Sequence, residues 1–177
     1  MKFLSEDNVI MHKEYVRTKK LQYSILEKSI PGLYGKSVNE ILTMRLGTRD
    51  KSDALRLLTD ISLHELFFTS FGDVQYERSD LIRSLYGSEG QFLNEMYRAC
   101  LDIEYGFTVA LLRGRDVRIY SANEYVTLFE LGVPVLAVDV CEHAYFLDYG
   151  FDKEKYLTNA LVRLNIGKID KISRQNK

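Results

Sequence analysis

The stretch Pro134–Asn165, PVLAVDVCEHAYFLDYGFDKEKYLTNALVRLN, decides the fold of the C-terminal part of this chain. The apolar run Val133–Val140 predicts a buried strand, and the residues after it can begin a helix. Asp139 and His143 lie four residues apart at this junction. A strand that leads directly into a helix is a rigid place to hold two ligands of one metal ion.

The chain has only three histidines, so His12 and His64 are the remaining candidates for the same site. Three imidazoles and one carboxylate favour Fe, Mn, Zn, Co or Ni over ions that prefer thiolates. On an ion that accepts five ligands, one place stays open for water or a small substrate. Spacing by itself is a weak signal, because a histidine on an apolar helix face is more often a core or surface residue than a ligand.

The N-terminal part predicts two long helices over residues 5–29 and 51–71, with a short helix at Ser37–Arg45 between them. Pro31 and Gly32 end the first helix. Two long helices with a short connection indicate an antiparallel hairpin. Gly72–Arg78 reads as a linker, which divides the chain into an N-terminal helical domain, residues 1–75, and a C-terminal α/β domain, residues 76–177.

The C-terminal part predicts helices first and then a sheet. Helical patterns cover residues 79–84, 88–104 and 152–166, and residues 167–177 read as a solvated polar tail. Phe107–Leu112 and Val117–Ser121 predict a β-hairpin, and Val133–Val140 supplies a third strand. The fold class is therefore α+β, with a three-stranded antiparallel sheet.

The composition is typical of a soluble globular protein, with 46% hydrophobic and 28% charged residues. A formal charge of −1 offers no overall attraction to nucleic acid or to an anionic membrane. We expect no signal peptide, no membrane span and a cytoplasmic location. Cys100 and Cys141 do not form a disulfide framework and read as small buried residues.

At this point the sequence resembles the iron/manganese superoxide dismutases. DVCEHAYFLDY (Asp139–Tyr149) is similar to the DVWEHAYYLDY signature of that family. LSEDNVIMH (Leu4–His12) and LTDISLHELFF (Leu58–Phe68) are similar to the helical segments that carry its first two histidine ligands. The resemblance implies the helical hairpin and α/β domain expected above, with one Fe or Mn ion per chain. Its ligands would be His12, His64, Asp139 and His143.

The residues around these ligands depart from the family pattern. Lys20 stands where the family has a gateway tyrosine, and Cys141 stands where it has a tryptophan. The family's glutamine, which binds the metal's water ligand, comes from one of two positions, matched here by Asp60 and Glu124. Either acid could tune the metal, act as a base or ligate it directly, and either also fits a plain solvent-facing charge.

Two further residues bear on substrate and assembly. Lys20 could draw in superoxide, a small anion, although a surface lysine of a helix fits equally well. Glu142 matches the family's glutamate that reaches across a dimer interface to the ligand histidine of the other subunit, which implies a homodimer.

Three functions therefore stay open. The first is an Fe- or Mn-dependent dismutase that converts superoxide to oxygen and peroxide. The second is another metalloenzyme on the same scaffold, an oxidase or oxygenase that acts on a larger organic molecule. The third is a non-catalytic interaction protein. Since neither glutamine position is occupied by glutamine, the residues do not distinguish iron from manganese.

Overall fold

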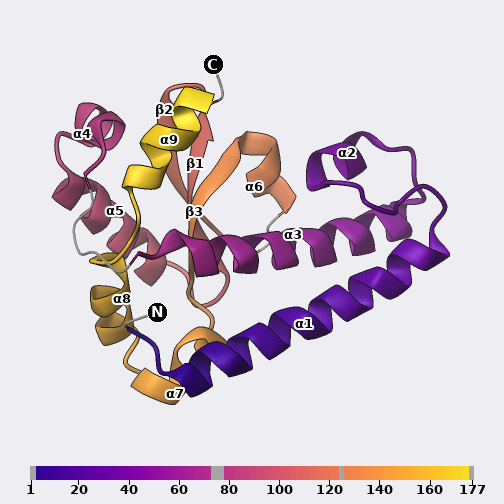
Figure 1. Ribbon diagram of the computed structural model, residues 1–177, viewed down its shortest axis with the longest axis horizontal. Helices are drawn as coiled ribbons and strands as arrows, with labels where there is room; N and C mark the ends of the chain where they lie inside the picture. The colour runs from indigo at the N-terminus through magenta and orange to yellow at the C-terminus, as the bar shows by residue number, and fades with distance from the viewer. Residues whose placement is uncertain (1–2, 73–77, 124–125, 176–177) are drawn as a thin grey trace.

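The N-terminal half of the molecule is a long antiparallel pair of helices (Figure 1). In the computed structural model, which describes residues 3–72, 78–123 and 126–175, these are α1 (Glu6–Ser29) and α3 (Thr48–Ser70). The short helix α2 (Val38–Thr43) lies in the connection. Ser5 begins α1, because its hydroxyl accepts a hydrogen bond from the backbone N–H of Asn8. The predicted helical hairpin is confirmed.

The sheet has three antiparallel strands in the order β2-β1-β3. They are β1 (Phe107–Arg113), β2 (Asp116–Ala122) and β3 (Val133–Asp139). Phe107–Leu112 of the central strand is buried at every position, so both faces of the sheet are covered. Asp139 pairs with Phe107 at the end of β3. The predicted three-stranded antiparallel sheet, and with it the α+β fold class, is confirmed.

Short helices complete the C-terminal half. They are α4 (Asp80–Tyr86), α5 (Glu89–Leu101), α6 (Val126–Leu131), the 3-10 turn η1 (Glu142–Ala144), α7 (Phe146–Tyr149), α8 (Lys153–Leu161) and α9 (Gly167–Gln175). Within the described residues, no helix is both long enough and apolar enough to cross a bilayer.

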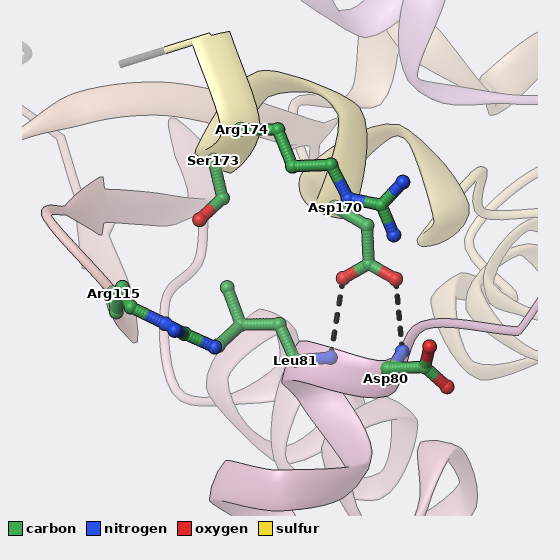
Figure 2. Close-up of a pocket in the computed structure, with 6 residues that line it drawn as sticks. All are labelled: Asp80, Leu81, Arg115, Asp170, Ser173 and Arg174. Carbon is green, nitrogen blue, oxygen red and sulfur yellow. Dashed lines mark hydrogen bonds between the residues drawn. The ribbon is translucent and has the colours of Figure 1, made fainter. Parts of the chain in front are cut away.

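The expectation of a solvated tail was wrong, because residues 167–175 form helix α9. Ile169 is fully buried, and the Asp170 carboxylate accepts hydrogen bonds from the backbone N–H groups of Asp80 and Leu81, at 2.9 and 3.1 Å (Figure 2). Arg115 and Arg174 line the hollow beside this contact. Ile169, Ile172 and the capping carboxylate of Asp170 together dock a segment whose composition is otherwise polar.

The two halves share a hydrophobic core. Leu63 and Phe67 of α3 are fully buried in the same cluster as the strands and α5, while a second cluster fills the far end of the helical hairpin around Leu33 and Ile41. The division of the chain near residue 75 stays a prediction, and most of the proposed linker, residues 73–77, lies outside the described residues. The shared core holds α3 rigidly against the sheet.

Candidate metal centre

The four predicted ligands come from four different elements. His12 lies on the buried face of α1, His64 on the buried face of α3, Asp139 at the end of β3 and His143 in η1. The Asp139 carboxylate accepts a hydrogen bond from the backbone N–H of Cys141 through Oδ1, at 2.8 Å. This local bond turns the chain after β3 and leaves Oδ2 directed at the histidines.

The donor atoms of these residues converge on one point. One donor atom from each residue lies within 4.8 Å of the others. Asp139 Oδ2 is 3.2 Å from Nε2 of His12, 3.3 Å from Nε2 of His64 and 3.0 Å from Nε2 of His143. His12 and Asp139 are fully buried and His64 is nearly so, whereas the His143 side chain keeps 29% of its surface exposed.

The arrangement fits a cation better than a set of hydrogen bonds. Although His12 Nε2 and Asp139 Oδ2 lie within ion-pair distance, neither atom has a hydrogen-bond partner among the described residues. A buried polar atom without a partner costs about 1–3 kcal/mol. An ion between the three imidazoles and the carboxylate would satisfy all four donors, and the N/O donor set suits Fe or Mn.

The surroundings of the four donors also set their protonation states. Burial raises the pKa of Asp139, but the neighbouring imidazoles of His12, His143 and His64 outweigh burial and hold that pKa well below its usual range. Burial lowers the pKa of His12, so its imidazole is neutral. Metal ligation requires an ionised carboxylate and neutral imidazoles, which Asp139 and His12 supply. Burial lowers the pKa of His64, but hydrogen bonds with Asp139 and Asp60 outweigh burial and raise that pKa to about 10, so an ion must displace a proton from this ring.

Aromatic rings enclose the donors on several sides. The rings of Phe67 and Phe68 lie 5.0 Å from that of His12, and the ring of Phe107 lies 4.9 Å from that of His64. On the remaining side, the ring of Tyr15 stacks on His143 at 4.5 Å with an interplanar angle of 23°. The ligands are therefore screened from water on several sides.

Asp60 lies next to the site but outside the group of four donors. Its Oδ1 is 3.1 Å from Nδ1 of His64, the nitrogen that faces away from the centre. Its Oδ2 is 3.4 Å from Nζ of Lys19 and accepts a long hydrogen bond from the Tyr15 hydroxyl, at 3.5 Å. With both oxygens held in this way, the geometry does not support the alternative in which Asp60 binds the metal directly.

Sequence reasoning did not find Tyr15 and Lys19. The helical repeat could have indicated both, because Tyr15 follows His12 by three residues and Lys19 follows Tyr15 by four, which places them on neighbouring faces of α1. The aromatic contact with His143 depends on tertiary packing and has no local signal.

The other candidates lie further out. Lys20 is half-exposed and forms an ion pair with Glu65 of α3. Glu142 is exposed beside His143, and Glu124 lies outside the described residues. Cys141 is partly buried, and its Sγ accepts a hydrogen bond from the Gly106 backbone N–H at 3.2 Å. Burial raises the pKa of this thiol, so it stays protonated at neutral pH.

Two comparisons with known proteins bear on this site. A family model described as iron/manganese superoxide dismutases, C-terminal domain, matches residues 75–172. A protein named superoxide dismutase (Fe) 2, chloroplastic, from Oryza sativa subsp. japonica is 32% identical over 83 residues. That alignment covers 45% of this chain and 32% of the relative, so it spans about a third of the relative's length. The family match includes Asp139 and His143, whereas His12 and His64 precede it.

Proposed function

The chain belongs to the iron/manganese superoxide dismutase family, and from this premise we propose that it disproportionates superoxide at one Fe or Mn ion. His12, His64, Asp139 and His143 would hold the ion. The bound ion would supply the one-electron redox chemistry by which one superoxide is oxidised to oxygen and a second, with two protons, is reduced to hydrogen peroxide.

The convergence of the four donor atoms within 4.8 Å is the observation that carries this proposal. Two of the donors precede the matched family segment and come from helices of the N-terminal half. A structural role alone gives no reason to direct three imidazole nitrogens at one buried carboxylate oxygen. The convergence therefore also disfavours the non-catalytic alternative.

The protein's residues have distinct tasks in this scheme. Asp139 and His12 bind from fully buried positions, which excludes water and strengthens electrostatic interactions within the site. The partial exposure of His143 marks the side from which a small anion can approach. Lys20 would attract that anion, with its charge partly offset by Glu65.

The second candidate is an oxidase or oxygenase that acts on a larger organic molecule. It is favoured by Asp60, which supplies a carboxylate next to the centre where the family places glutamine. The ring enclosure weighs against it, because Phe67, Phe68 and Tyr15 fill space that a larger substrate would need. We therefore prefer superoxide as the substrate.

A homodimer completes the proposal. Glu142 is exposed beside His143, as a residue that crosses to a second subunit must be. Phe146 and Phe151 lie exposed in the same segment, with ring centroids 5.1 Å apart. An apolar surface beside the metal centre is suited to association with a second copy. The cytoplasmic location stays a prediction.

The test is elemental analysis of the purified protein together with a superoxide assay on wild type and His64→Ala. We expect about one Fe or Mn ion per wild-type chain, dismutase activity in the wild type, and loss of both in the variant. Thr69→Ala is the matched control, because Thr69 is an exposed residue of the same helix.

Bound metal without dismutase activity would exclude the first function and leave the second. A folded wild-type protein that binds no Fe or Mn would exclude both and support the interaction role.

A further inference from the structure

The Asp60 side chain approaches the metal centre from behind one ligand. Asp60 is 7% exposed, and its Oδ1 lies 3.1 Å from Nδ1 of His64. The same ring nitrogen lies 2.7 Å from the backbone oxygen of Asp60. Two oxygens of one residue therefore face the Nδ1–H of His64, which leaves Nε2 as the nitrogen that faces Asp139.

This position differs from that of a group acting on the metal's water ligand. Asp60 is outside the set of converging donors and contacts the far nitrogen of His64 instead. A carboxylate that accepts a hydrogen bond from a ligand histidine fixes the ring and makes its other nitrogen a stronger donor. The contact that links Asp60 to the four donors is therefore the one with this imidazole.

Lys19 and Tyr15 hold the other carboxylate oxygen. Lys19 Nζ is 3.4 Å from Asp60 Oδ2, and both side chains are largely buried, at 21% and 9% exposure. The same Nζ lies 4.9 Å from the centre of the Tyr15 ring. An ion pair with little access to water is screened weakly, so the charge of Lys19 partly offsets that of Asp60 where His64 experiences it.

We propose that Asp60 is a positioning residue that sets the reduction potential of the bound metal through His64, and that Lys19 moderates its charge. This inference rests on the proposed function only in that an Fe or Mn ion occupies the site. The negative charge of Asp60 beside His64 stabilises the higher oxidation state of the ion. Removing that charge should favour the reduced ion, and removing the charge of Lys19 should favour the oxidised ion.

The experiment is an optical redox titration of the iron-loaded protein for wild type, Asp60→Asn and Lys19→Met, after metal content is measured for each. Asparagine retains a side-chain oxygen that can accept a hydrogen bond from His64 Nδ1–H, but it lacks the negative charge of Asp60. We expect Asp60→Asn to raise the ratio of reduced to oxidised iron at a fixed potential at least tenfold, which is 59 mV for a one-electron couple. Lys19→Met should lower that ratio.

Glu65→Gln is the matched control. It removes one carboxylate from the same helix, but Glu65 is half-exposed and pairs with Lys20 rather than with a ligand. Its titration should match that of the wild type. An unchanged titration in Asp60→Asn, or an equal shift in Glu65→Gln, would overturn the inference.

The outcomes separate this inference from the proposed function. Iron-loaded protein that shows the expected opposite shifts but does not consume superoxide would overturn the dismutase proposal alone. Active, iron-loaded protein with unchanged potentials would overturn the role of Asp60 alone. If Asp60→Asn does not fold, Lys19→Met decides, since it removes the charge of Lys19, leaves Asp60 beside His64, and must shift the titration toward oxidised iron.

Discussion

At the scale of single residues, Lys20 shows how a neighbour changes the meaning of a charge. Lys20 lies eight residues after His12, and its side chain forms an ion pair with Glu65 on the facing helix α3. Both side chains are more than half exposed, so the pair contributes little to stability. Its effect should be on the approach of an anion.

We therefore expect Lys20→Gln to lower kcat/KM for superoxide at low ionic strength by roughly twofold to tenfold, the low end of electrostatic steering. The difference should shrink as salt is added, because the Debye length falls from about 30 Å at 0.01 M to about 8 Å at 0.15 M. Stopped-flow rates across this range measure the effect.

Lys28→Gln is the control for Lys20, because Lys28 lies in the last turn of α1, roughly 12 Å further along the helix axis. Its rates should equal those of the wild type. A Lys20→Gln defect that does not vary with salt would contradict steering.

At the scale of elements, the end of α3 stabilises the edge of the sheet that carries Asp139. β3 is an edge strand, and its outer side faces α3. Ser70 Oγ accepts a hydrogen bond from the Ala137 N–H at 2.8 Å and donates one to the Leu66 carbonyl. A buried hydroxyl thus satisfies a strand N–H that has no neighbouring strand on that side.

Ser70→Ala should lower the free energy of unfolding by about 1–3 kcal/mol, because it leaves the buried Ala137 N–H without its acceptor. Urea denaturation measures the change. Thr69→Ala is the control, since Thr69 is exposed, and it should stay within about 0.5 kcal/mol of the wild type. Equal effects of the two substitutions would show that the hydrogen bond to β3 contributes nothing.

The start of α2 carries a pH-dependent cap. Hydrogen bonds to Glu40 from Lys36 and from the backbone and hydroxyl of Ser37 lower the pKa of Glu40 to about 2. A lowered carboxyl pKa contributes stability above the ordinary value of 4.5, and this contribution is lost as the pH falls toward 2.

We expect the Glu40 carboxyl carbon to titrate by NMR well below the ordinary glutamate value of 4.5. In Lys36→Met its pKa should rise toward 4.5, because the charged hydrogen bond from Lys36 Nζ is gone. A Glu40 titration that Lys36→Met leaves unchanged would contradict the cap.

At the scale of the whole molecule, the candidate metal centre joins elements from both halves, and exposed apolar residues lie close in the chain to His12 and His143. Figure 1 shows α7 beside the start of α1. Ile10, Phe146, Leu147 and Phe151 there are between 44% and 85% exposed. Association through this surface would place Glu142 of each copy at the interface.

Phe146→Glu should convert a dimer to a monomer in sedimentation velocity, because a charge would be buried against an apolar surface. Tyr34→Glu is the control, since Tyr34 is 84% exposed at the far end of the helical hairpin. Metal content should remain the same in both variants. A wild type that sediments as a monomer would exclude the homodimer.

Local patterns were sufficient for the long elements. The helical periods of α1 and α3 and the β-rich runs of the three strands predicted their type, because each element is long enough to show its repeat. The prediction of a solvated tail was wrong because α9 is a short helix, and its stability comes from the contacts of Ile169 and Asp170 with other elements. Composition does not report such contacts.

The sequence by itself determined the four proposed metal ligands and the helices and strands that carry them, since a signature motif and residue chemistry are local properties. Only the tertiary structure decided what surrounds those ligands. Tyr15 stacks on His143, and Asp60 turns toward His64 with Lys19 behind it. The direction of a buried side chain depends on which elements pack beside it, and that packing is settled by the whole core rather than by any single segment.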